Sequence, residues 1–499
     1  MTSEIRFDPR MSDAEALMWR LDKDPYLSST FGNLSILDRA PDFDRLRRRM
    51  ERAAVAIPRL RQRVQSSPAN ITPPTWVDDP DFDIDFHVRR VAVPAPGGLR
   101  ELLDLCALVV ADPFDRTRPL WQFVVFEGLA DGKAALLEKL HHTIADGEGS
   151  VQLSLQFFDF ERDAPEPEPL APPSESGADS SIPADLWRDL LAGPMKIPLA
   201  LVRQIRDLIA HPTEIATSGS STIDTVRSLL GTLTDVEPAR SPIWTQRSVR
   251  RHMEIVRVPF LSARDTARHL GGTLNTVLLS AASDAAGRYH REFGSPVDEL
   301  RASMAVSTRK SVAGHDSSAN AFSLARMLVP TGEMHPVERF GAVDAICRDA
   351  AGSSADVALD AVSALASSMP TAILTRVARL QAQTVDFATS NVKGTPIPVY
   401  VAGSEIVANH PFGPLGGVAF NLTLLSHVGQ LDMGLHVDRA AVQHPGRLRD
   451  HLADSLADLV AAGSPPATST TTSKTTSKTT SKTTSKTTSS KKKATKKKS

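Results

Sequence analysis

A stretch rich in proline, glutamate and serine divides this sequence into two halves. Residues 161–185 read ERDAPEPEPLAPPSESGADSSIPAD, which offers no periodic apolar face, so we expect a linker there. On both sides of it, alternating apolar patterns typical of strands are interspersed with 3.6-residue patterns typical of helices. The chain is therefore expected to fold as mixed α/β or α+β domains, in which helices cover sheets.

The first half contains five segments with clear periodicity: helices at residues 12–22 and 41–54, a strand at 83–93, and a hairpin whose strands span 120–126 and 134–140. Ser12 and Glu15 have the spacing of a capping box, which favours a helix start there. A helical period restarts at Val151 and continues to Phe158. We expect this first domain to span residues 1–160.

The second half has a similar mixture of patterns. Residues 161–240 predict the linker followed by an interrupted amphipathic helix that crosses to a second domain, which is expected at 241–463. Within that domain we expect a strand at residues 251–258, a helix at 274–293, a strand region at 391–437 and a final helix at 447–462.

The last segment, residues 464–499, differs in composition from the rest. It contains ten lysines and no acidic residue, and no large apolar residue follows Val460, so we expect a disordered tail. The formal net charge of -1 is therefore a balance: without these ten of the 57 lysines and arginines, 47 basic residues face 58 acidic ones, a net charge of -11. The tail favours contact with an anionic membrane or lipid-droplet surface. Nonspecific contact with nucleic acid and a purely solubilising role are the alternatives.

Composition excludes several classes of protein. Cys106 and Cys347 are the only cysteines, too few for a disulfide framework or a multi-cysteine zinc site, which favours a reducing compartment. The charged N-terminal residues predict no secretion signal, and no apolar run approaches the roughly 20 residues that span a bilayer. We therefore expect a cytoplasmic protein that associates peripherally with the inner face of the plasma membrane or with lipid droplets.

The strongest chemical signal is the segment HHTIADG at residues 141–147, which has the pattern HHxxxDG. It follows a predicted strand and precedes a helical period, so it is expected to form a strand-to-helix turn. A histidine at such a turn projects from a rigid sheet into a cleft, where an imidazole suits general-base chemistry near neutral pH. Asp146 can orient the loop or cap the next helix, and Gly147 lets the backbone turn or a ligand approach closely.

Several other roles for these residues stay open on the sequence alone. His141 is as well explained by packing and hydrogen bonding as by catalysis, because strand alternation points it to the face opposite His142. For Asp146, a structural ion pair or a helix cap is the favoured role. A metal site would need a third ligand at motif spacing, and because the sequence offers none, we expect no metal.

HHxxxDG is the hallmark of an acyltransferase superfamily that includes chloramphenicol acetyltransferase and the condensation domains of peptide synthetases. The chain most closely resembles the bacterial wax ester synthase/diacylglycerol acyltransferase family, whose usual features recur here in order. They are WVDD at 76–79, FDIDFHVRR at 82–90, FDR at 114–116, RPLW at 118–121, HHTIADG, GTLN at 272–275, VSTR at 306–309, SNV at 390–392 and VYVAG at 399–403. This ordered series spans about residues 11–459 and is far more specific than HHxxxDG alone.

The resemblance implies a fold of two chloramphenicol-acetyltransferase-like domains with a tunnel between them and the histidine loop at its centre. It makes His142 the general base, with His141 in a supporting role. The base would remove the proton from a long-chain alcohol, or from the free hydroxyl of diacylglycerol, as that oxygen attacks the thioester of acyl-coenzyme A. Acyl-coenzyme A is then a co-substrate, no cofactor is bound permanently, and the product is a wax ester or triacylglycerol.

One position departs from the family pattern. The family usually has Asn-Asp where this chain has Asn275 and Thr276, so a carboxylate is missing. If that aspartate supports the wall of the active site, activity or substrate choice would differ; if it only stabilises a helix start, Thr276 suffices. Asn275 is retained as a candidate substrate-binding residue, together with Ser390 and Asn391.

Two other functions stay open as alternatives. A condensation-type acyltransferase acting on carrier-bound acyl groups shares HHxxxDG, but the flanking motifs fit the lipid family better. A catalytically weak lipid-droplet coat or tethering protein is the second alternative, motivated by Thr276 and by the lysine-rich tail. The sequence does not indicate an oligomeric state.

Overall fold

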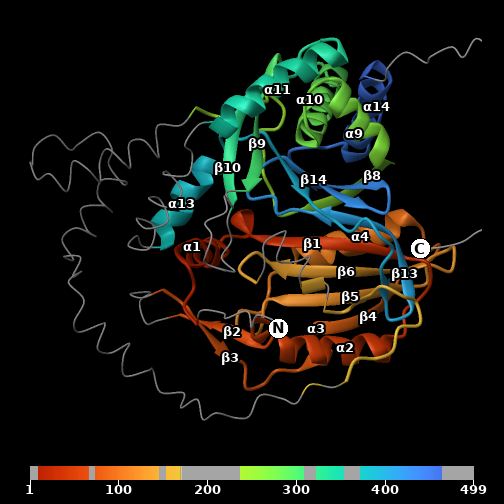
Figure 1. Cartoon of the computed structure of the whole chain (residues 1–499). Helices are drawn as coiled ribbons and strands as arrows, with labels where there is room; N and C mark the ends of the chain where they lie inside the picture. The colour runs from red at the N-terminus through yellow and green to blue at the C-terminus, as the bar shows by residue number, and fades with distance from the viewer. Residues whose placement is uncertain are drawn as a thin grey trace, which may run out of the picture. The chain divides into compact units, whose positions relative to one another are not determined.

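The computed structural model of the chain describes residues 9–66, 73–144, 153–154, 156–168, 170, 237–307, 322–352 and 371–463. Most of these residues fold around two large β-sheets, one of seven and one of six strands (Figure 1). The predicted tail, most of the predicted linker and Val151 lie outside the described residues. No helix in the described part of the chain is long and apolar enough to cross a membrane.

The seven-stranded sheet has the order β4-β5-β6-β1-β13-β12-β7. Its strands are β1 (Thr30–Leu37), β4 (Val88–Ala92), β5 (Trp121–Glu127), β6 (Ala134–His141), β7 (Phe158–Asp159), β12 (Tyr400–Val401) and β13 (Ser404–Phe412). The predicted hairpin is confirmed, because β5 and β6 pair antiparallel. Strands β12 and β13 come from the second half of the chain, so both halves contribute to this sheet.

The first half also supplies helices and a small two-stranded sheet. These elements are α1 (Asp13–Leu21), η1 (Pro25–Leu27), α2 (Phe43–Ala56), η2 (Pro58–Leu60), β2 (Gln62–Gln65), β3 (Thr75–Asp78), α3 (Ile84–His87) and α4 (Leu99–Ala111). Helix α2 packs on the face of β6 that carries Leu136, and α4 packs on the face that carries Leu137. The two helices predicted in this half are confirmed. The first has its capping box: the Ser12 N–H donates to Glu15 Oε2 at 2.8 Å, and the Glu15 N–H donates to Ser12 Oγ at 3.3 Å.

The strand predicted at residues 83–93 is wrong in its first half. The segment forms the helical turn α3, followed by the short strand β4. The Asp83 side chain accepts the N–H of Asp85 at 3.0 Å, which starts the turn. His87 is fully buried, and its ring stacks on Trp121 with a centroid distance of 4.4 Å. This remote contact favours the turn over an extended strand.

The helical period predicted from Val151 to Phe158 is wrong at its end, because Phe158 lies in β7. This short strand pairs antiparallel with β12 from the second half of the chain. Next to it, Asp159 forms ion pairs with Arg45 at 3.1 Å and Arg49 at 2.5 Å, both on α2. Local periodicity does not reveal strand and ion-pair partners that lie so far away in the sequence.

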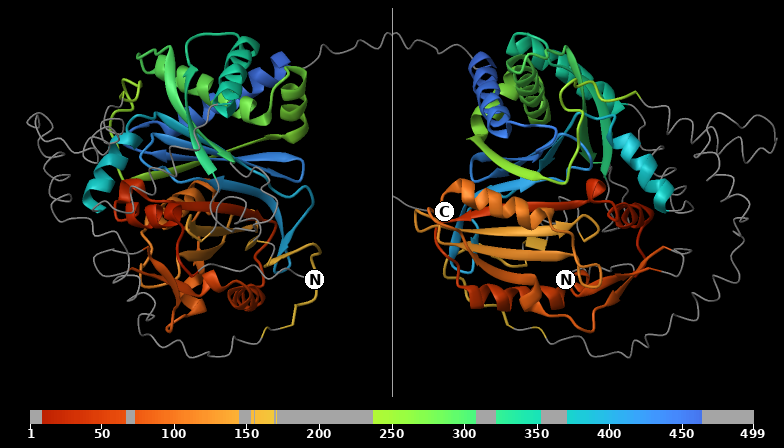
Figure 2. Two further views of the ribbon diagram at one scale, coloured as in Figure 1. Left: turned by 60° about the vertical axis from the view of Figure 1, so that its left-hand side comes forward. Right: turned by 180° about the vertical axis from the view of Figure 1, so that it is seen from behind.

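The six-stranded sheet has the order β10-β9-β11-β14-β15-β8. Its strands are β8 (Arg251–Pro259), β9 (Glu299–Ser307), β10 (Phe322–Pro330), β11 (Phe387–Val392), β14 (Phe420–His427) and β15 (Gln430–Asp438). The face turned away from the seven-stranded sheet is covered by α9 (Phe260–His269), α10 (Leu274–Glu292), α11 (Pro336–Gly352) and α14 (Pro445–Gly463) (Figures 1 and 2). Helix α13 (Thr371–Ala382) packs beside α1. The predicted first strand, the two predicted helices and the predicted strand region of this half are confirmed.

Strand β13 connects the two sheets. It pairs with β1 in the seven-stranded sheet, while its other side packs against β14 and β15. The Asn409 N–H of β13 donates to Asp432 Oδ2 of β15 at 2.7 Å. The backbones come very close at Gly434, where an added Cβ would lie 2.0 Å from the Pro411 carbonyl oxygen. The sheets therefore meet without room for a side chain at that point.

Replacing Gly434 with alanine should destabilise the protein. The new methyl group would overlap the Pro411 carbonyl, so β13 and β15 would have to separate, and we expect the free energy of unfolding to fall by about 3 kcal/mol. Gly446→Ala in α14 is the matched control, because no atom lies within 4 Å of its added Cβ and alanine is the better helix former. Urea unfolding measures both variants. Equal stability of the two would contradict the close approach.

Candidate active site

The two histidines of the HHxxxDG segment lie at the end of β6, where the strand passes into a turn. The His141 N–H donates to the Leu120 carbonyl at 3.1 Å, and the His142 N–H donates to the Ser29 carbonyl at 3.1 Å. The residue before β5 and the segment before β1 therefore fix the backbone of the pair.

His142 is the more accessible histidine of the two. Its side chain is partly exposed, and its ring centroid lies 4.8 Å from that of Phe31, with the planes tilted by 48°. A partly exposed imidazole on a fixed backbone can meet a ligand while keeping one orientation. The other predicted members of the loop, Asp146 and Gly147, lie outside the described residues.

His141 is fully buried, and hydrogen bonds set its tautomer. Its Nδ1 accepts the Thr143 N–H at 3.2 Å, so its proton is on Nε2. The Thr143 hydroxyl lies 2.8 Å from the same Nδ1. Nε2 faces the carboxylate of Asp22 at 3.6 Å. His141 is thus tied to the loop on one side and to the end of α1 on the other.

Asp22, at the C-terminal end of α1, is a site residue that sequence reasoning missed. Its carboxylate lies 3.4 Å from Nη1 of Arg116, whose guanidinium is held over the Trp19 ring at 3.2 Å. Burial alone would raise the pKa of the Asp22 carboxyl, but contacts with His141, Ser28 and Arg116 together hold the pKa below its ordinary value. Asp22 is therefore an anion at neutral pH. No local pattern in the sequence marks it.

Two buried ionisable side chains precede the histidines on β6. Glu138 and Lys139 point to opposite faces of the sheet, and burial shifts the pKa of each to about 8, upward for Glu138 and downward for Lys139. The Ser154 hydroxyl donates to Glu138 Oε2 at 3.4 Å, and Lys139 Nζ donates to the Asp112 carbonyl at 2.7 Å. Glu138 is therefore protonated at neutral pH and joins β6 to the chain that follows the histidine loop.

The structure explains how the helix start at α10 tolerates the missing carboxylate. Thr276 is fully buried, and its N–H donates to Thr273 Oγ1 at 3.2 Å in a capping box. Its hydroxyl donates to Asp344 Oδ1 of α11 at 2.9 Å. The helix start is thus capped without an aspartate at this position, and a carboxylate reaches it from α11. Of the two interpretations of Thr276, these contacts support the structural one.

The structure brings two of the three predicted substrate-binding residues together. Asn391 Nδ2 donates to Asn275 Oδ1 at 2.7 Å, which joins the end of β11 to the start of α10. Ser390 points to the other face of the sheet, beside Thr423 of β14. These three residues belong to the six-stranded sheet and its helix, whereas His142 follows a strand of the seven-stranded sheet.

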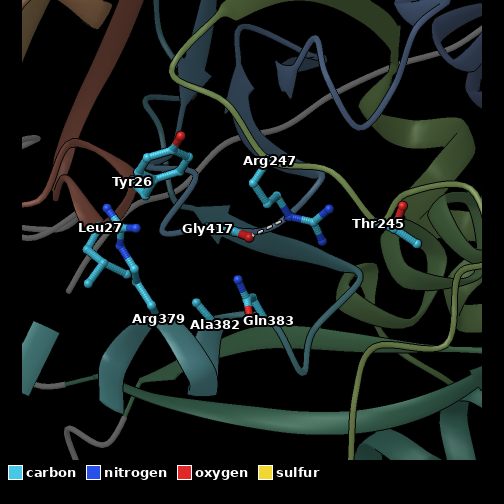
Figure 3. A pocket seen from close by; sticks show the side chains of 8 residues that line it. All are labelled: Tyr26, Leu27, Thr245, Arg247, Arg379, Ala382, Gln383 and Gly417. Atoms are coloured by element: carbon cyan, nitrogen blue, oxygen red, sulfur yellow. Dashed lines mark hydrogen bonds between the residues drawn. The ribbon is translucent and has the colours of Figure 1, made fainter. Parts of the chain in front are cut away.

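A pocket of about 210 Å³ lies where the two halves of the chain meet (Figure 3). Tyr26 and Leu27 of η1 form one wall, directly before the segment that contacts the histidine turn. The other wall contains two arginines. The Arg379 guanidinium lies over the Tyr26 ring at 4.5 Å, and Arg247 Nε donates to the Gly417 carbonyl at 2.7 Å.

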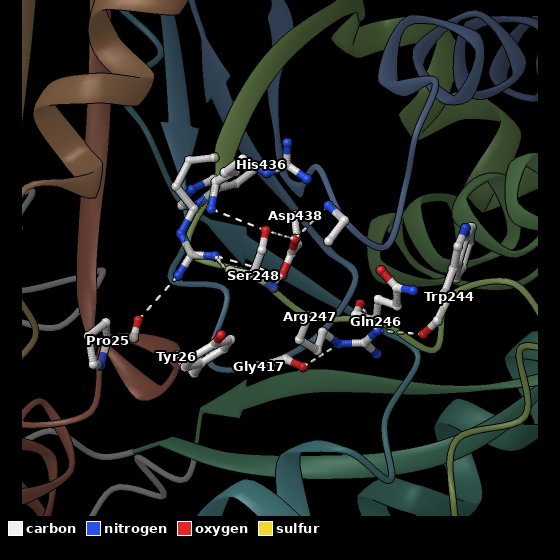
Figure 4. A network of polar contacts seen from close by, with 12 residues as sticks. Pro25, Tyr26, Trp244, Gln246, Arg247, Ser248, Gly417, His436 and Asp438 are labelled. Carbon is white, nitrogen blue, oxygen red and sulfur yellow. Dashed lines mark hydrogen bonds and ion pairs between the residues drawn. The ribbon is translucent and has the colours of Figure 1, made fainter.

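A polar network fixes η1 to the second half of the chain (Figure 4). Arg251 Nη2 donates to the Pro25 carbonyl at 3.2 Å, and its Nη1 donates to the Ser248 carbonyl at 2.9 Å. Asp438 accepts both the N–H and the hydroxyl of Ser248 at 2.6 Å. Because η1 leads directly to Ser29, the C-terminal sheet helps to hold the carbonyl that binds the histidine turn.

The cysteines do not offer a nucleophile. Both are free, and burial raises the pKa of the Cys106 thiol strongly and that of Cys347 to about 11. Neither thiol is ionised at neutral pH. Among the described residues, no group of three or more His, Cys, Asp or Glu side chains could hold a metal ion.

Comparison with known proteins decides the family. Residues 11–278 match the wax ester synthase/diacylglycerol acyltransferase catalytic domain, and residues 318–460 match the C-terminal domain of the same family. The chain belongs to the wax ester synthase/diacylglycerol acyltransferase family. It is an acyltransferase, as the motif series predicts. A protein of Mycobacterium tuberculosis that carries the name diacylglycerol O-acyltransferase is 33% identical over 451 residues, which cover 87% of this chain and 89% of the relative.

Two solved structures show the same fold. The wax ester synthase/diacylglycerol acyltransferase from Marinobacter aquaeolei VT8 has a TM-score of 0.62 at 21% identity. The match covers 91% of this chain and 99% of the Marinobacter chain. The first condensation domain of the calcium-dependent antibiotic synthetase has a TM-score of 0.52 at 14% identity and covers 93% and 98%. The predicted fold class, a mixed α/β fold of two domains, is confirmed.

Replacing Asp22 with asparagine should weaken catalysis while the protein stays folded. The amide keeps the shape of the side chain but removes the negative charge that His141 and Arg116 face. Because the histidine turn then loses part of its orientation, we expect kcat for coenzyme A release to fall on the order of 10- to 100-fold. Asp115→Asn, which changes a carboxylate that is 45% exposed, is the matched control and should be fully active. Equal kcat in both variants would exclude a positioning role for Asp22.

The pKa of Glu138 predicts a pH dependence of stability. The folded protein keeps this proton up to a pH of about 8, whereas the unfolded chain loses it near pH 4.5. The stability that this group contributes is therefore fully present below about pH 4.5 and is lost as the pH rises to about 8. We expect the Tm of the wild type to fall by roughly 5 °C relative to that of Glu138→Gln between about pH 5 and pH 8. Parallel Tm curves would contradict a buried, protonated Glu138.

Proposed function

We propose that the protein transfers an acyl group from acyl-coenzyme A to the hydroxyl of diacylglycerol or of a long-chain alcohol, with His142 as the general base. One observation supports this most: the partly exposed His142 stands on a fixed backbone at the end of β6, beside a buried His141 whose tautomer is set. A proton acceptor in O-acyl transfer needs this accessibility and this fixed direction. The name of the Mycobacterium tuberculosis relative supports a diacylglycerol acceptor.

The proposed reaction needs no covalent enzyme intermediate. His142 accepts the hydroxyl proton as the alcohol oxygen attacks the thioester carbonyl, which gives a tetrahedral oxyanion. Collapse of this intermediate breaks the C–S bond, and the departing sulfur takes the proton from the imidazolium. One C–O bond forms, one C–S bond breaks, and the proton moves from the alcohol to the thiol. Because thiolate is a good leaving group, alignment and activation of the hydroxyl are the main demands.

We assign positioning roles to most of the other residues predicted for the site. His141 directs the turn from which the base projects, and Asp146 and Gly147 shape the loop that follows. Asn275 and Asn391 hold α10 and β11 together through their hydrogen bond. In this proposal, the surrounding side chains hold the base in position while it acts on the substrate hydroxyl.

Ser390 is the residue of the predicted set that we place in contact with substrate. It lies on the sheet face opposite α10, beside Thr423, whose Oγ1 accepts the N–H of Gly413 at 3.2 Å. Gly413 directly follows β13, so this face is turned to the sheet that leads to His142. A substrate between the sheets would meet Ser390 before it met the asparagine pair.

We place an anionic part of acyl-coenzyme A beside Arg247 in the pocket that Tyr26 and Arg379 also line, because the Arg379 guanidinium is already paired with the Asp24 carboxylate (Figure 3). Guanidinium groups bind phosphate through several donors, and coenzyme A carries phosphates whereas the acceptor lipids proposed here do not. The pocket adjoins η1, which leads to the histidine turn. We therefore place the approach of the acyl donor on this side.

We also propose that the lysine-rich tail holds the protein to an anionic membrane or lipid-droplet surface in the cytoplasm, where a lipid acceptor resides. Ten lysines without an acidic residue supply about 1 kcal/mol each when they lie close to such a surface. Nonspecific contact with nucleic acid would use the same charge.

Replacing His142 with alanine should abolish acyl transfer. Without the proton acceptor, release of coenzyme A in the presence of diacylglycerol or a long-chain alcohol should fall by about 100-fold or more. Thermal unfolding should change little, because the side chain is partly exposed. His269→Ala, at an exposed position of α9, is the matched control and should keep full activity. Normal turnover by a folded His142→Ala protein would overturn the assignment of the base.

An acceptor screen with several acyl-coenzyme A chain lengths separates the alternative functions. Ester formation from acyl-coenzyme A supports the proposal. Turnover only with acyl groups on a carrier protein would favour a condensation-type enzyme. No turnover on any acceptor, together with lipid-droplet association that His142→Ala leaves unchanged, would favour a coat or tethering protein.

A further inference from the structure

Three exposed aliphatic side chains gather at one end of the six-stranded sheet. Leu261, Ile397 and Val428 expose 55%, 49% and 39% of their surface. They belong to three separate segments: the start of α9, the loop between β11 and β12, and the turn between β14 and β15. We call these three side chains the apolar tip.

Backbone hydrogen bonds hold the three segments side by side. The Val428 N–H donates to the Thr395 carbonyl at 3.2 Å, and the Phe260 N–H donates to the Gly429 carbonyl at 3.0 Å. Thr395 Oγ1 also donates to the Ile397 carbonyl at 2.6 Å, which closes the loop on itself. The apolar tip is therefore a fixed feature of the fold.

Val428 is held in a conformation that valine disfavours. Its φ is 41° and that of Gly429 is 75°, the left-handed pair of a two-residue hairpin turn. Asparagine and aspartate are common at the first of these positions, and β-branched residues are rare there. The Val428 side chain belongs to none of the hydrophobic clusters of the described structure. A strained, exposed valine of this kind points to a contact outside the chain.

Two basic side chains reach the surface beside the apolar tip. Lys393 is exposed directly after β11, and Arg257, whose side chain is 40% exposed, lies near the end of β8. Asp432, the ion-pair partner of Arg257, is fully buried, so the positive group is the one that faces solvent. Arg264 and Asp265 form an ion pair at 2.8 Å, so their charges cancel. Apolar side chains flanked by positive charge complement an anionic lipid surface.

We propose that the apolar tip inserts into the headgroup region of an anionic phospholipid surface and orients the folded chain on it. Three aliphatic side chains on separate turns suit shallow insertion, whereas a bound peptide needs a continuous groove or a free strand edge. Lys393 and Arg257 then lie level with the lipid phosphates. This surface goes beyond the acyl-transfer reaction, and it differs from the lysine-rich tail, which offers charge but no apolar contact.

Binding of the full chain to vesicles tests the apolar tip. Vesicles of phosphatidylcholine with roughly 30% phosphatidylglycerol are sedimented at low salt and in about 0.5 M NaCl, where screening removes most of the contribution of the tail. We expect the wild type to keep part of its binding at high salt, because salt does not screen apolar insertion. Val428→Asn should then lower the vesicle partition coefficient by about fivefold or more. The triple variant with Leu261→Gln and Ile397→Ser should bind at background.

Val428→Asn separates vesicle binding from folding. An asparagine-glycine pair relieves the strained turn, so the Tm should stay equal or rise, and a loss of binding cannot come from unfolding. Leu380→Gln is the matched control. Leu380 exposes 38% of its surface but lies on α13, which leads into the opposite end of β11. This control should bind vesicles like the wild type.

Two results would overturn the proposal. The first is equal binding of Val428→Asn and the wild type at high salt, including no binding by either. The second is a changed oligomeric state of the triple variant with unchanged vesicle binding, which would make the apolar tip a protein interface. An assay of coenzyme A release from detergent-dispersed substrates distinguishes failure of this proposal from failure of the catalytic proposal. Val428→Asn should retain that activity, whereas His142→Ala should lose it and still bind vesicles.

Discussion

The pairing of β13 with β1 is the contact on which the candidate active site depends. β13 comes from the second half of the chain, yet it extends the sheet of the first half. Its other side meets β15 so closely at Gly434 that no side chain fits between them. This packing places the C-terminal sheet next to the chain that precedes β1. Arg251 then binds the Pro25 carbonyl, and η1 leads from there to the Ser29 carbonyl, which accepts the His142 N–H.

The two histidines are adjacent in sequence but lie in environments that suit different tasks. His141 is buried between Thr143 and the anion of Asp22, so it is held in one tautomer and cannot reach a substrate. His142 lies beside Phe31 and is partly exposed, so it is able to reach a substrate. When a thioester already supplies a good leaving group, catalysis depends mainly on the alignment of the hydroxyl and its base. In the proposed reaction, the fixed position of His142 therefore contributes to catalysis alongside its basicity.

The distance between interacting partners determines what the sequence can predict. The hairpin of β5 and β6 and the capping box at Ser12 depend on neighbouring residues, and local patterns predict them correctly. Local patterns do not predict the turn α3, because its packing partner Trp121 is remote in the sequence. The pairing of β13 with β1 and the contact of Asp22 with His141 leave no local pattern in the sequence. The sequence allows two interpretations of Thr276, and only the folded chain places Asp344 beside it.

Chemical rescue tests most directly whether His142 removes the proton from the acceptor hydroxyl. In His142→Gly, the space left by the side chain can admit imidazole, which supplies the same proton acceptor. We predict that release of coenzyme A by this variant stays at background without imidazole and rises in proportion to added imidazole, while the wild type does not respond. Wild-type turnover by the folded variant without imidazole would contradict the claim.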